Sequence, residues 1–437
     1  MIRIKIKSGG YMKKHLIVIY TLLISMTLLA EYNYPFKDPN MATIIGSSTL
    51  MTEGIPEKID IKEYKIKLPW SKPVMENFWY NEGFKYSVVS QNRKAPLIFL
   101  LAGTGSSHNS VRMEYFQRIF YKAGYHVVSI SSPMNSNFVI NASTNQMPGI
   151  IIEDSEDIYN VMEAINEKIT SELEISDYYL VGYSLGGTEA GILSWIDERE
   201  KKFNFKRVFM INPAVNLYKS ALKLDRYMNY AENERAEKVA QLINNILNTV
   251  ISSIIPEYTT FDMETIFKVF SQKKLSDKEM QQLIGGAFRL TSIDLNYITD
   301  VVNDRKVYVK EPVNKFSPMF KYFEEINFAT FEEYINKLAF PYYKEKLGEQ
   351  LTLDELLKKA NLSYIEDYLK NSSKVMAVTN ADELILDSED LEFLKMIFGK
   401  RLVIYPYGGH CGNMFFTPNI KVMLEFLEKG EIEYENK

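Results

Sequence analysis

One serine, flanked by glycines and placed between an apolar strand and a helix, constrains this chain most. Residues 182–187 read Gly-Tyr-Ser-Leu-Gly-Gly; they follow the apolar run 178–181 and precede a helix-like run at 188–196. A sharp strand-to-helix turn leaves no room for side chains two residues either side of the serine, so glycine is required there. The turn holds the hydroxyl of Ser184 clear of the sheet. The alternative is a helix-starting serine without chemistry, which this context makes the weaker interpretation.

The C-terminal part of the chain offers an acid and a histidine after two successive strands. Residues 374–379 read as a short buried strand that leads to Asp382, and residues 401–405 read as a strand that leads to His410. A nucleophilic serine needs a histidine as its base and an acid that orients the histidine. We therefore predict that Ser184, Asp382 and His410 form one catalytic site.

Two further acids, Glu383 and Asp387, lie in the same loop and compete with Asp382 for the orienting role. Asp382 is preferred because the α/β-hydrolase superfamily, which the chain resembles, places its acid there, three residues after the last residue of the strand, Thr379.

The chain order serine, acid, histidine and these three positions resemble the α/β-hydrolase superfamily. The resemblance covers about 95–212 and 374–428. It implies a mostly parallel sheet with helices on both faces, and a serine hydrolase that works through an acyl-enzyme.

The same resemblance implies where an oxyanion would bind. The apolar strand 96–101 ends in Ala-Gly-Thr-Gly at 102–105, where the family usually has His-Gly-x-Gly. By this match the backbone N–H groups of Thr104 and Leu185 are the two oxyanion donors. Ala102 stands where the family often has histidine, but that histidine is not a member of the triad.

The rest of the N-terminal half alternates between strands and helices. We predict an edge strand at 84–89, then strands at 97–101, 125–130 and 207–211, with helices at 111–123 and 153–169. Such alternation is typical of a parallel sheet covered by helices. Residues 31–80 are rich in proline and aromatic residues, and we expect an irregular segment that wraps the sheet edge. Residues 81–212 and 374–437 would form the hydrolase core.

Strand signals disappear between 213 and 373. Helical patterns occur instead at 222–250, 263–270, 277–288, 331–346 and 354–369. In the resembling family a cap is inserted at this place, so we predict that 213–373 is a helical cap over Ser184. Its aromatic residues are candidates for an apolar acyl site, the alternative being ordinary helix packing; they are Phe316, Phe320, Tyr322, Phe323, Phe328, Phe331, Tyr334, Phe340, Tyr342 and Tyr343.

Residues 1–30 are predicted to be a targeting segment. Lys13 and Lys14 precede an apolar stretch from Leu16 to Ala30, the pattern of a secretory signal, and the stretch is short for a membrane span. We expect the protein to be exported, and hence periplasmic or extracellular. The alternative is an uncleaved segment that anchors the protein to a membrane.

Composition excludes several classes of function. The chain of 437 residues has 51 basic and 56 acidic residues and no basic stripe, which argues against nucleic acid as a partner. Its four histidines and single cysteine show no metal-ligand spacing, so no metal or other cofactor is predicted. We expect Cys411 to pack rather than react, although it adjoins His410, and we expect His126 to be a core or edge histidine.

The sequence thus favours an exported serine hydrolase acting on an ester, thioester or amide of a small-molecule or lipid-like acyl substrate. Two alternatives stay open. An acyltransferase would use the same acyl-enzyme with a different incoming nucleophile. A non-catalytic binding protein would use the same fold, because a fold does not fix a function.

Overall fold

The computed structural model describes residues 32–47, 54–228, 241, 275–318, 322, 326 and 329–432. The described residues from 36 onward belong to one compact unit, and residues 32–35 belong to another. The predicted targeting segment lies outside the described residues. Within these ranges, no helix combines the length and the apolar composition that crossing a bilayer requires.

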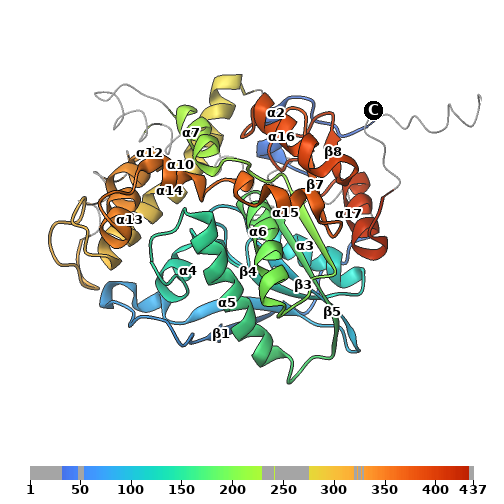
Figure 1. Cartoon of the computed structure of the whole chain (residues 1–437), viewed down its shortest axis with the longest axis horizontal. Coiled ribbons are helices and arrows are strands. Elements are labelled where there is room, and N and C mark those ends of the chain that lie inside the picture. Colours follow the sequence, from blue (N-terminus) through green and yellow to red (C-terminus); the bar gives the residue numbers. More distant parts are fainter. Residues whose placement is uncertain are drawn as a thin grey trace, which may run out of the picture. The chain divides into compact units, whose positions relative to one another are not determined.

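The described residues form an eight-stranded sheet in the order β1-β2-β4-β3-β5-β6-β7-β8 (Figure 1). Pairing of β1 with β2 and of β2 with β4 is antiparallel, and all other pairs are parallel. The strands are β1 Lys62–Ile66, β2 Phe84–Val89, β3 Ala95–Leu101, β4 His126–Ile130, β5 Ile175–Tyr183, β6 Arg207–Ile211, β7 Val375–Asn380 and β8 Leu402–Tyr405. The predicted fold class, a mostly parallel sheet with helices, is confirmed.

The helices surround this sheet in Figure 1. They are α2 Pro39–Ile45, α3 Val111–Lys122, α4 Ser136–Asn141, α5 Ile151–Ile169, α6 Leu185–Glu200, α7 Leu217–Arg226, α10 Asp277–Val302, α12 Phe331–Tyr334, α13 Phe340–Leu347, α14 Leu353–Lys358, α15 Glu366–Asn371, α16 Ser388–Phe398 and α17 Thr417–Lys429. Two neighbours on β6 show that helices cover both faces, since adjacent strand residues point to opposite sides. Met210 meets Gly191 of α6, whereas Phe209 meets Phe426 of α17.

The central strands are apolar because both of their faces are covered. In β3, Leu97 to Leu101 are buried without interruption, and every residue of β7 is buried. Such strands read as continuous apolar runs rather than as alternating ones. This is why the sequence located them well.

The edge of the sheet was predicted wrongly. The segment Phe84–Val89 is β2, and β1 lies outside it as the true edge strand. β1 reads Lys-Glu-Tyr-Lys-Ile and falls in the stretch 31–80 that we expected to be irregular. Charged side chains are common on edge strands because they discourage pairing with other chains. Three of the five residues of β1 are charged, and Tyr64 and Ile66 pack against the hydrophobic core.

Between β6 and β7 the described residues form helices and loops without a strand, as the pattern of 213–373 predicted. The helix predicted at 277–288 continues to Val302 as α10. The one predicted at 354–369 is divided into α14, a 3₁₀ turn at Leu362–Ile365 and α15. Of the helix predicted at 222–250, residues 222–228 and 241 are described, and residues 222–226 belong to α7. The helix predicted at 263–270 lies outside the described residues.

The insertion is fixed to the core through the loop that precedes α5. The hydroxyl of Tyr334 donates a hydrogen bond of 2.6 Å to the carbonyl of Pro148. The hydroxyl of Tyr343 donates one of 3.0 Å to the carbonyl of Met147. Both tyrosines are buried, so these bonds hold the helices at a defined place beside the sheet.

Candidate active site

Ser184 lies at the tip of a strained turn between β5 and α6. Its backbone has φ 55° and ψ −125°, a conformation that costs a non-glycine residue about 1–3 kcal/mol and is typical of functional sites. A Cβ on Gly182 would lie 2.0 Å from the carbonyl oxygen of Gly186. A Cβ on Gly186 would lie 2.6 Å from the carbonyl oxygen of Leu101. The glycines are therefore required by close backbone approach, as the sequence predicted.

The predicted serine and histidine are brought together. Ser184 Oγ and His410 Nε2 are 2.8 Å apart, across 226 residues of sequence. His410 lies in the loop after β8, and its side chain is 16% exposed. A hydroxyl within hydrogen-bond distance of an imidazole is the geometry of a serine whose proton a histidine can remove.

The acid that faces His410 is Glu383, and the predicted contact of Asp382 with the imidazole is wrong. Glu383 Oε1 lies 2.8 Å from His410 Nδ1, and the Glu383 side chain is fully buried. The second carboxylate oxygen, Oε2, accepts a hydrogen bond of 2.6 Å from Asn212 Nδ2. Both oxygens are thus engaged, which fixes the orientation of the carboxylate.

Asp382 faces the backbone of the histidine loop instead. Its Oδ1 accepts the N–H of Gly409 at 2.9 Å, and its Oδ2 accepts the N–H of Gly408 at 3.2 Å. Burial raises the pKa of the Asp382 carboxyl, and the two N–H groups act in the opposite direction. Successive residues of a turn point in different directions, and the longer glutamate reaches the ring.

The third candidate acid, Asp387, has a separate role. It caps α16 by accepting the N–H of Asp390 at 3.0 Å, and it forms an ion pair of 2.5 Å with Lys219. The structure does not bring it to His410.

The electrostatic surroundings of His410 favour its charged form. Burial lowers the pKa of the imidazole, whereas the adjacent Cys411 and Glu383 raise it, and the net pKa lies well above the ordinary histidine value. A carboxylate beside Nδ1 stabilises the imidazolium that forms when the serine loses its proton.

Thr104 and Leu185 line one cavity together with Ser184 and His410. Leu185 is the first residue of α6, and N–H groups in a first helical turn have no partner within the helix. Gly103 must be glycine, because a Cβ there would lie 2.7 Å from the Tyr183 ring. Both predicted oxyanion residues thus line the cavity that contains Ser184.

The cavity at Ser184 has a volume of about 30 Å³ and is mostly apolar. The insertion supplies much of its wall: Leu217, Ser220, Ala221 and Leu224 from α7, Phe288 from α10 and Phe331 from α12. The hydroxyl of Ser220 donates to the carbonyl of Ile385 at 2.9 Å, so it is already used in a hydrogen bond.

The other aromatic candidates divide between core and surface. Tyr322, Tyr334 and Tyr343 are buried in the hydrophobic core, whereas Phe316 is 82% exposed. Phe340 and Tyr342 are partly buried against the same core. Phe320, Phe323 and Phe328 lie outside the described residues. Phe331 is therefore the one candidate, among the described residues, that lines the cavity at Ser184.

Sequence reasoning missed two polar residues that hold the site. Asn212 follows β6 with φ 45°, a left-handed conformation that asparagine tolerates better than most residues, and it binds Glu383. An asparagine directly after a strand is a usable signal. Thr43 accepts the backbone N–H of His410 at 2.8 Å, and no feature of the sequence indicates this.

Cys411, which we expected to pack rather than react, and His126, which we expected in the core or at an edge, are both buried. Cys411 is buried, and its Sγ lies 3.8 Å from His410 Nε2. His126 is buried in β4, where its Nδ1 accepts the N–H of Gln91 at 3.0 Å. Among the described residues, no group of three or more histidine, cysteine, aspartate or glutamate side chains is arranged to hold a metal ion.

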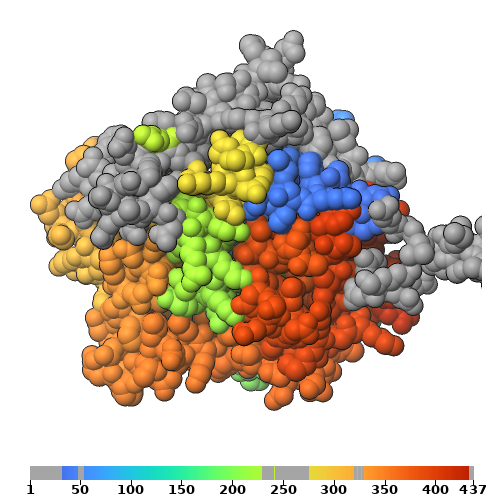
Figure 2. Space-filling model, turned by 90° about the horizontal axis from the view of Figure 1, so that it is seen from above, coloured from blue at the N-terminus to red at the C-terminus, as the bar shows by residue number. Residues whose placement is uncertain are grey.

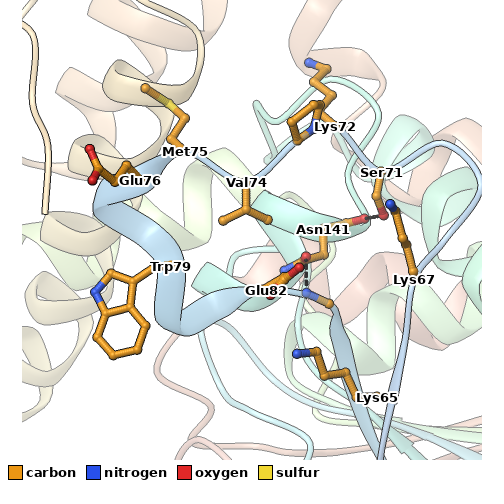
Figure 3. Close-up of a pocket in the computed structure, with 12 residues that line it drawn as sticks. Lys65, Lys67, Ser71, Lys72, Val74, Met75, Glu76, Trp79, Glu82 and Asn141 are labelled. Atoms are coloured by element: carbon orange, nitrogen blue, oxygen red, sulfur yellow. Dashed lines mark hydrogen bonds between the residues drawn. The ribbon is translucent and has the colours of Figure 1, made fainter.

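A larger groove of about 680 Å³ lies elsewhere and shares no lining residue with the cavity at Ser184. Figure 3 shows Lys65, Lys67 and Lys72 along one side of it and Val74, Met75 and Trp79 along another. Neither Ser184 nor His410 lines this groove. The smaller cavity is therefore the candidate active site.

Comparison with known proteins gives structural likeness only. No protein-family model matches the chain, and no curated protein matches it in sequence. A peroxisomal alpha-beta-hydrolase of Saccharomyces cerevisiae, Lpx1, is 12% identical over 87% of this chain and 94% of its own, with a TM-score of 0.43. An acylaminoacyl peptidase of Pyrococcus horikoshii is 13% identical over 87% of this chain, with a TM-score of 0.41.

This chain spans only 43% of that peptidase. A hyperthermophilic esterase of Pyrobaculum calidifontis is 13% identical over 94% of this chain and 97% of its own, with a TM-score of 0.40. Likenesses of this size carry no argument about activity. The α/β architecture of this chain stands on its sheet topology and on the turn at Ser184.

Proposed function

We propose that this α/β-hydrolase-fold chain is a serine hydrolase that cleaves a carboxylic ester, or the related thioester or amide, through an acyl-enzyme. One observation carries the proposal: Ser184 Oγ lies 2.8 Å from His410 Nε2, while Glu383 holds the other ring nitrogen at 2.8 Å. A strained serine, a base and an orienting acid within hydrogen-bond distance of one another form a catalytic triad by geometry.

In the first half of the reaction, Ser184 Oγ attacks the carbonyl carbon while His410 Nε2 takes the hydroxyl proton. The imidazolium then gives this proton to the leaving alkoxide, thiolate or amine as its bond to the carbonyl carbon breaks. In the second half, water attacks the carbonyl carbon of the acyl-enzyme and loses its proton to His410. His410 returns this proton to Ser184 Oγ as the bond between Oγ and the acyl carbon breaks, and the carboxylic acid leaves. The Glu383 carboxylate stabilises the imidazolium throughout.

The N–H groups of Thr104 and Leu185 are proposed to bind the oxyanion of each tetrahedral intermediate. The support is their position beside Ser184 and the start of α6 at Leu185. Donors placed in advance lower the barrier because they need no reorganisation when charge develops.

The mostly apolar cavity supports an uncharged acyl group as the part of the substrate that lies against the insertion. Leu217, Phe288 and Phe331 would contact that group. Among the described residues, His410 is the one titratable side chain that lines this cavity.

Labelling with a fluorophosphonate probe tests the proposal. The wild-type protein should be labelled at Ser184 and should hydrolyse short acyl esters, whereas Ser184→Ala should lose labelling and nearly all turnover. Phosphonylation of another residue at the wild-type rate in Ser184→Ala would show that the nucleophile lies elsewhere. Absence of labelling in a folded wild-type protein would favour a binding role.

We also propose that residues 1–30 direct the chain out of the cytoplasm, on the evidence of Lys13, Lys14 and the apolar run from Leu16 to Ala30. Mass spectrometry of protein recovered from the cell exterior or periplasm should find an N-terminus near Glu31. A full-length protein confined to the cytosolic fraction would contradict export.

A further inference from the structure

Helix α2 lies against the loop that carries His410, although the two are separated by almost the whole chain. Figure 2 shows α2, in blue, beside α10 in yellow and the C-terminal part in red. Helices α2 and α10 pack together, and α10 contributes Phe288 to the cavity at Ser184. The segment before the sheet therefore touches both the histidine loop and the insertion.

We infer that Thr43 of α2 is a positioning residue for His410, which makes α2 part of the active site. The inference rests on the proposed function and adds to it a residue outside the hydrolase sheet. Thr43 Oγ1 accepts the backbone N–H of His410 at 2.8 Å and donates its own proton to the carbonyl of Pro39 at 2.7 Å. Because a hydroxyl has one proton, the bond to Pro39 leaves its lone pairs directed at His410.

The histidine loop is shaped to receive the backbone of α2. A Cβ on Gly409 would lie 2.1 Å from the carbonyl oxygen of Pro39. A Cβ on Gly412 would lie 2.2 Å from the carbonyl oxygen of Ala42. Both positions must be glycine for α2 to lie where it does, and any side chain there would push it away from His410.

A second hydroxyl of the same segment contacts the loop without touching the histidine. Ser47 Oγ donates a hydrogen bond of 2.8 Å to the carbonyl of Gly412, and Ser47 is buried. This bond ties the segment to the loop two residues beyond His410. Ser47 therefore serves as a matched control for Thr43.

His410 is thus held at two atoms by groups from different parts of the chain. Glu383 holds ring nitrogen Nδ1, and Thr43 holds the backbone nitrogen. A shift of about 1 Å in a catalytic group can lower a rate about 10²-fold, so loss of either contact should affect turnover.

The test compares Thr43→Val, Thr43→Ser and Ser47→Ala with the wild-type protein. Valine has the shape of threonine but cannot accept the N–H of His410. We expect Thr43→Val to lower kcat for a short acyl ester about 10-fold or more, with KM changed less than about 2-fold, because Thr43 does not line the acyl cavity. Thr43→Ser restores the acceptor and should restore kcat to within about 2-fold of wild type.

Thermal unfolding of every variant separates positioning from loss of fold. Ser47→Ala should keep kcat while its melting temperature falls by as much as that of Thr43→Val. An unchanged kcat in Thr43→Val, or an equal loss of kcat in Ser47→Ala, would overturn the inference. If Thr43→Val does not fold, Thr43→Ala replaces it, and equal kcat values for Thr43→Ala and Thr43→Ser would overturn it as well.

The experiments distinguish an error in the proposed function from an error in the role of Thr43. A folded wild-type protein without fluorophosphonate labelling would remove the hydrolase itself. A labelled and active wild-type protein with a fully active Thr43→Val variant would remove only the role of Thr43.

Discussion

Two neighbouring carboxylates in the loop after β7 have different tasks. Glu383 orients the ring of His410, whereas Asp382 binds the N–H groups of Gly408 and Gly409 and so shapes the loop that carries this ring. Mutation of Glu383 should therefore affect the ring of His410, and mutation of Asp382 should affect the backbone that carries it. Mutation can therefore separate orientation of the imidazole from shaping of its loop.

Glu383→Gln should lower kcat by up to about 10⁴-fold, as loss of the orienting carboxylate does in triads. Asp382→Asn keeps an oxygen acceptor for one of the two glycine N–H groups, so we expect a loss of only about 10-fold. Steady-state hydrolysis of one short acyl ester by both variants measures the difference. A larger decrease of kcat in Asp382→Asn than in Glu383→Gln would show that Asp382 is the orienting acid.

The pH dependence of kcat/KM should also reveal the contact between Glu383 and His410. His410 must be neutral to accept the serine proton, so kcat/KM should fall as the pH drops through the raised pKa of His410. Glu383 raises this pKa, and its removal should lower it. The acid limb of kcat/KM for Glu383→Gln should therefore move to lower pH, even though the maximum rate falls. A limb that stays in place or moves to higher pH would contradict the electrostatic coupling.

At the scale of elements, the helical insertion lines the cavity at Ser184 but supplies none of the three triad residues. Helices α7, α10 and α12 line the cavity with apolar side chains, while the serine, histidine and glutamate follow strands of the sheet. Substrate preference and catalytic power should therefore respond to mutation separately.

Phe288→Ala should shift ester preference towards longer acyl chains, because it enlarges the cavity beside Ser184. Labelling of Ser184 by a small fluorophosphonate should change less than about 3-fold, since the triad is untouched. Phe288 is only partly buried, so the variant should fold more readily than Phe331→Ala, whose ring is 3% exposed. Rates on a series of esters from acetate to octanoate measure the preference.

Phe316→Ala is the control for Phe288→Ala, since Phe316 belongs to the same insertion but is 82% exposed and does not line the cavity. Its ester profile should match the wild-type profile. An unchanged profile in Phe288→Ala, or the same shift in Phe316→Ala, would contradict the proposed role of α10.

At the scale of the whole molecule, one buried carboxyl links stability to pH. Glu189 lies on α6 and is 1% exposed, and neither of its carboxyl oxygens has a hydrogen-bond partner among the described residues. Burial raises its pKa well above the ordinary value, and the nearby Asp154 adds to the effect. The folded state therefore keeps the proton at pH values where the unfolded chain has lost it.

A raised folded pKa means that this contribution to the free energy of unfolding is complete below the unfolded pKa and declines as the pH rises. Glu189→Gln keeps the shape without the ionisation, so its stability should decline less between pH 5 and pH 8, and the variant should be the more stable one at pH 8. Urea denaturation at several pH values in this range measures how the free energy of unfolding changes with pH in the wild-type protein and in Glu189→Gln. Glu200→Gln, an exposed carboxylate at the end of the same helix, should keep the wild-type slope.

The sequence by itself determined the features that local sterics and burial control. The turn at Ser184 follows from glycines that no other residue can replace, and the central strands follow from continuous apolar runs. These features predicted the sheet, the serine, the histidine and the helical nature of the insertion. The edge strand β1 was missed because three of its five residues are charged, which leaves Tyr64 and Ile66 as its only apolar residues.

The tertiary structure decided which groups surround the histidine. Asp382 and Glu383 follow the same strand, and their order along the chain cannot show which side chain turns towards a ring 27 residues away. That choice depends on Asn212, which holds Glu383, and on the glycine N–H groups that hold Asp382. Thr43 lies 367 residues from His410, and only folding brings its hydroxyl to the histidine backbone.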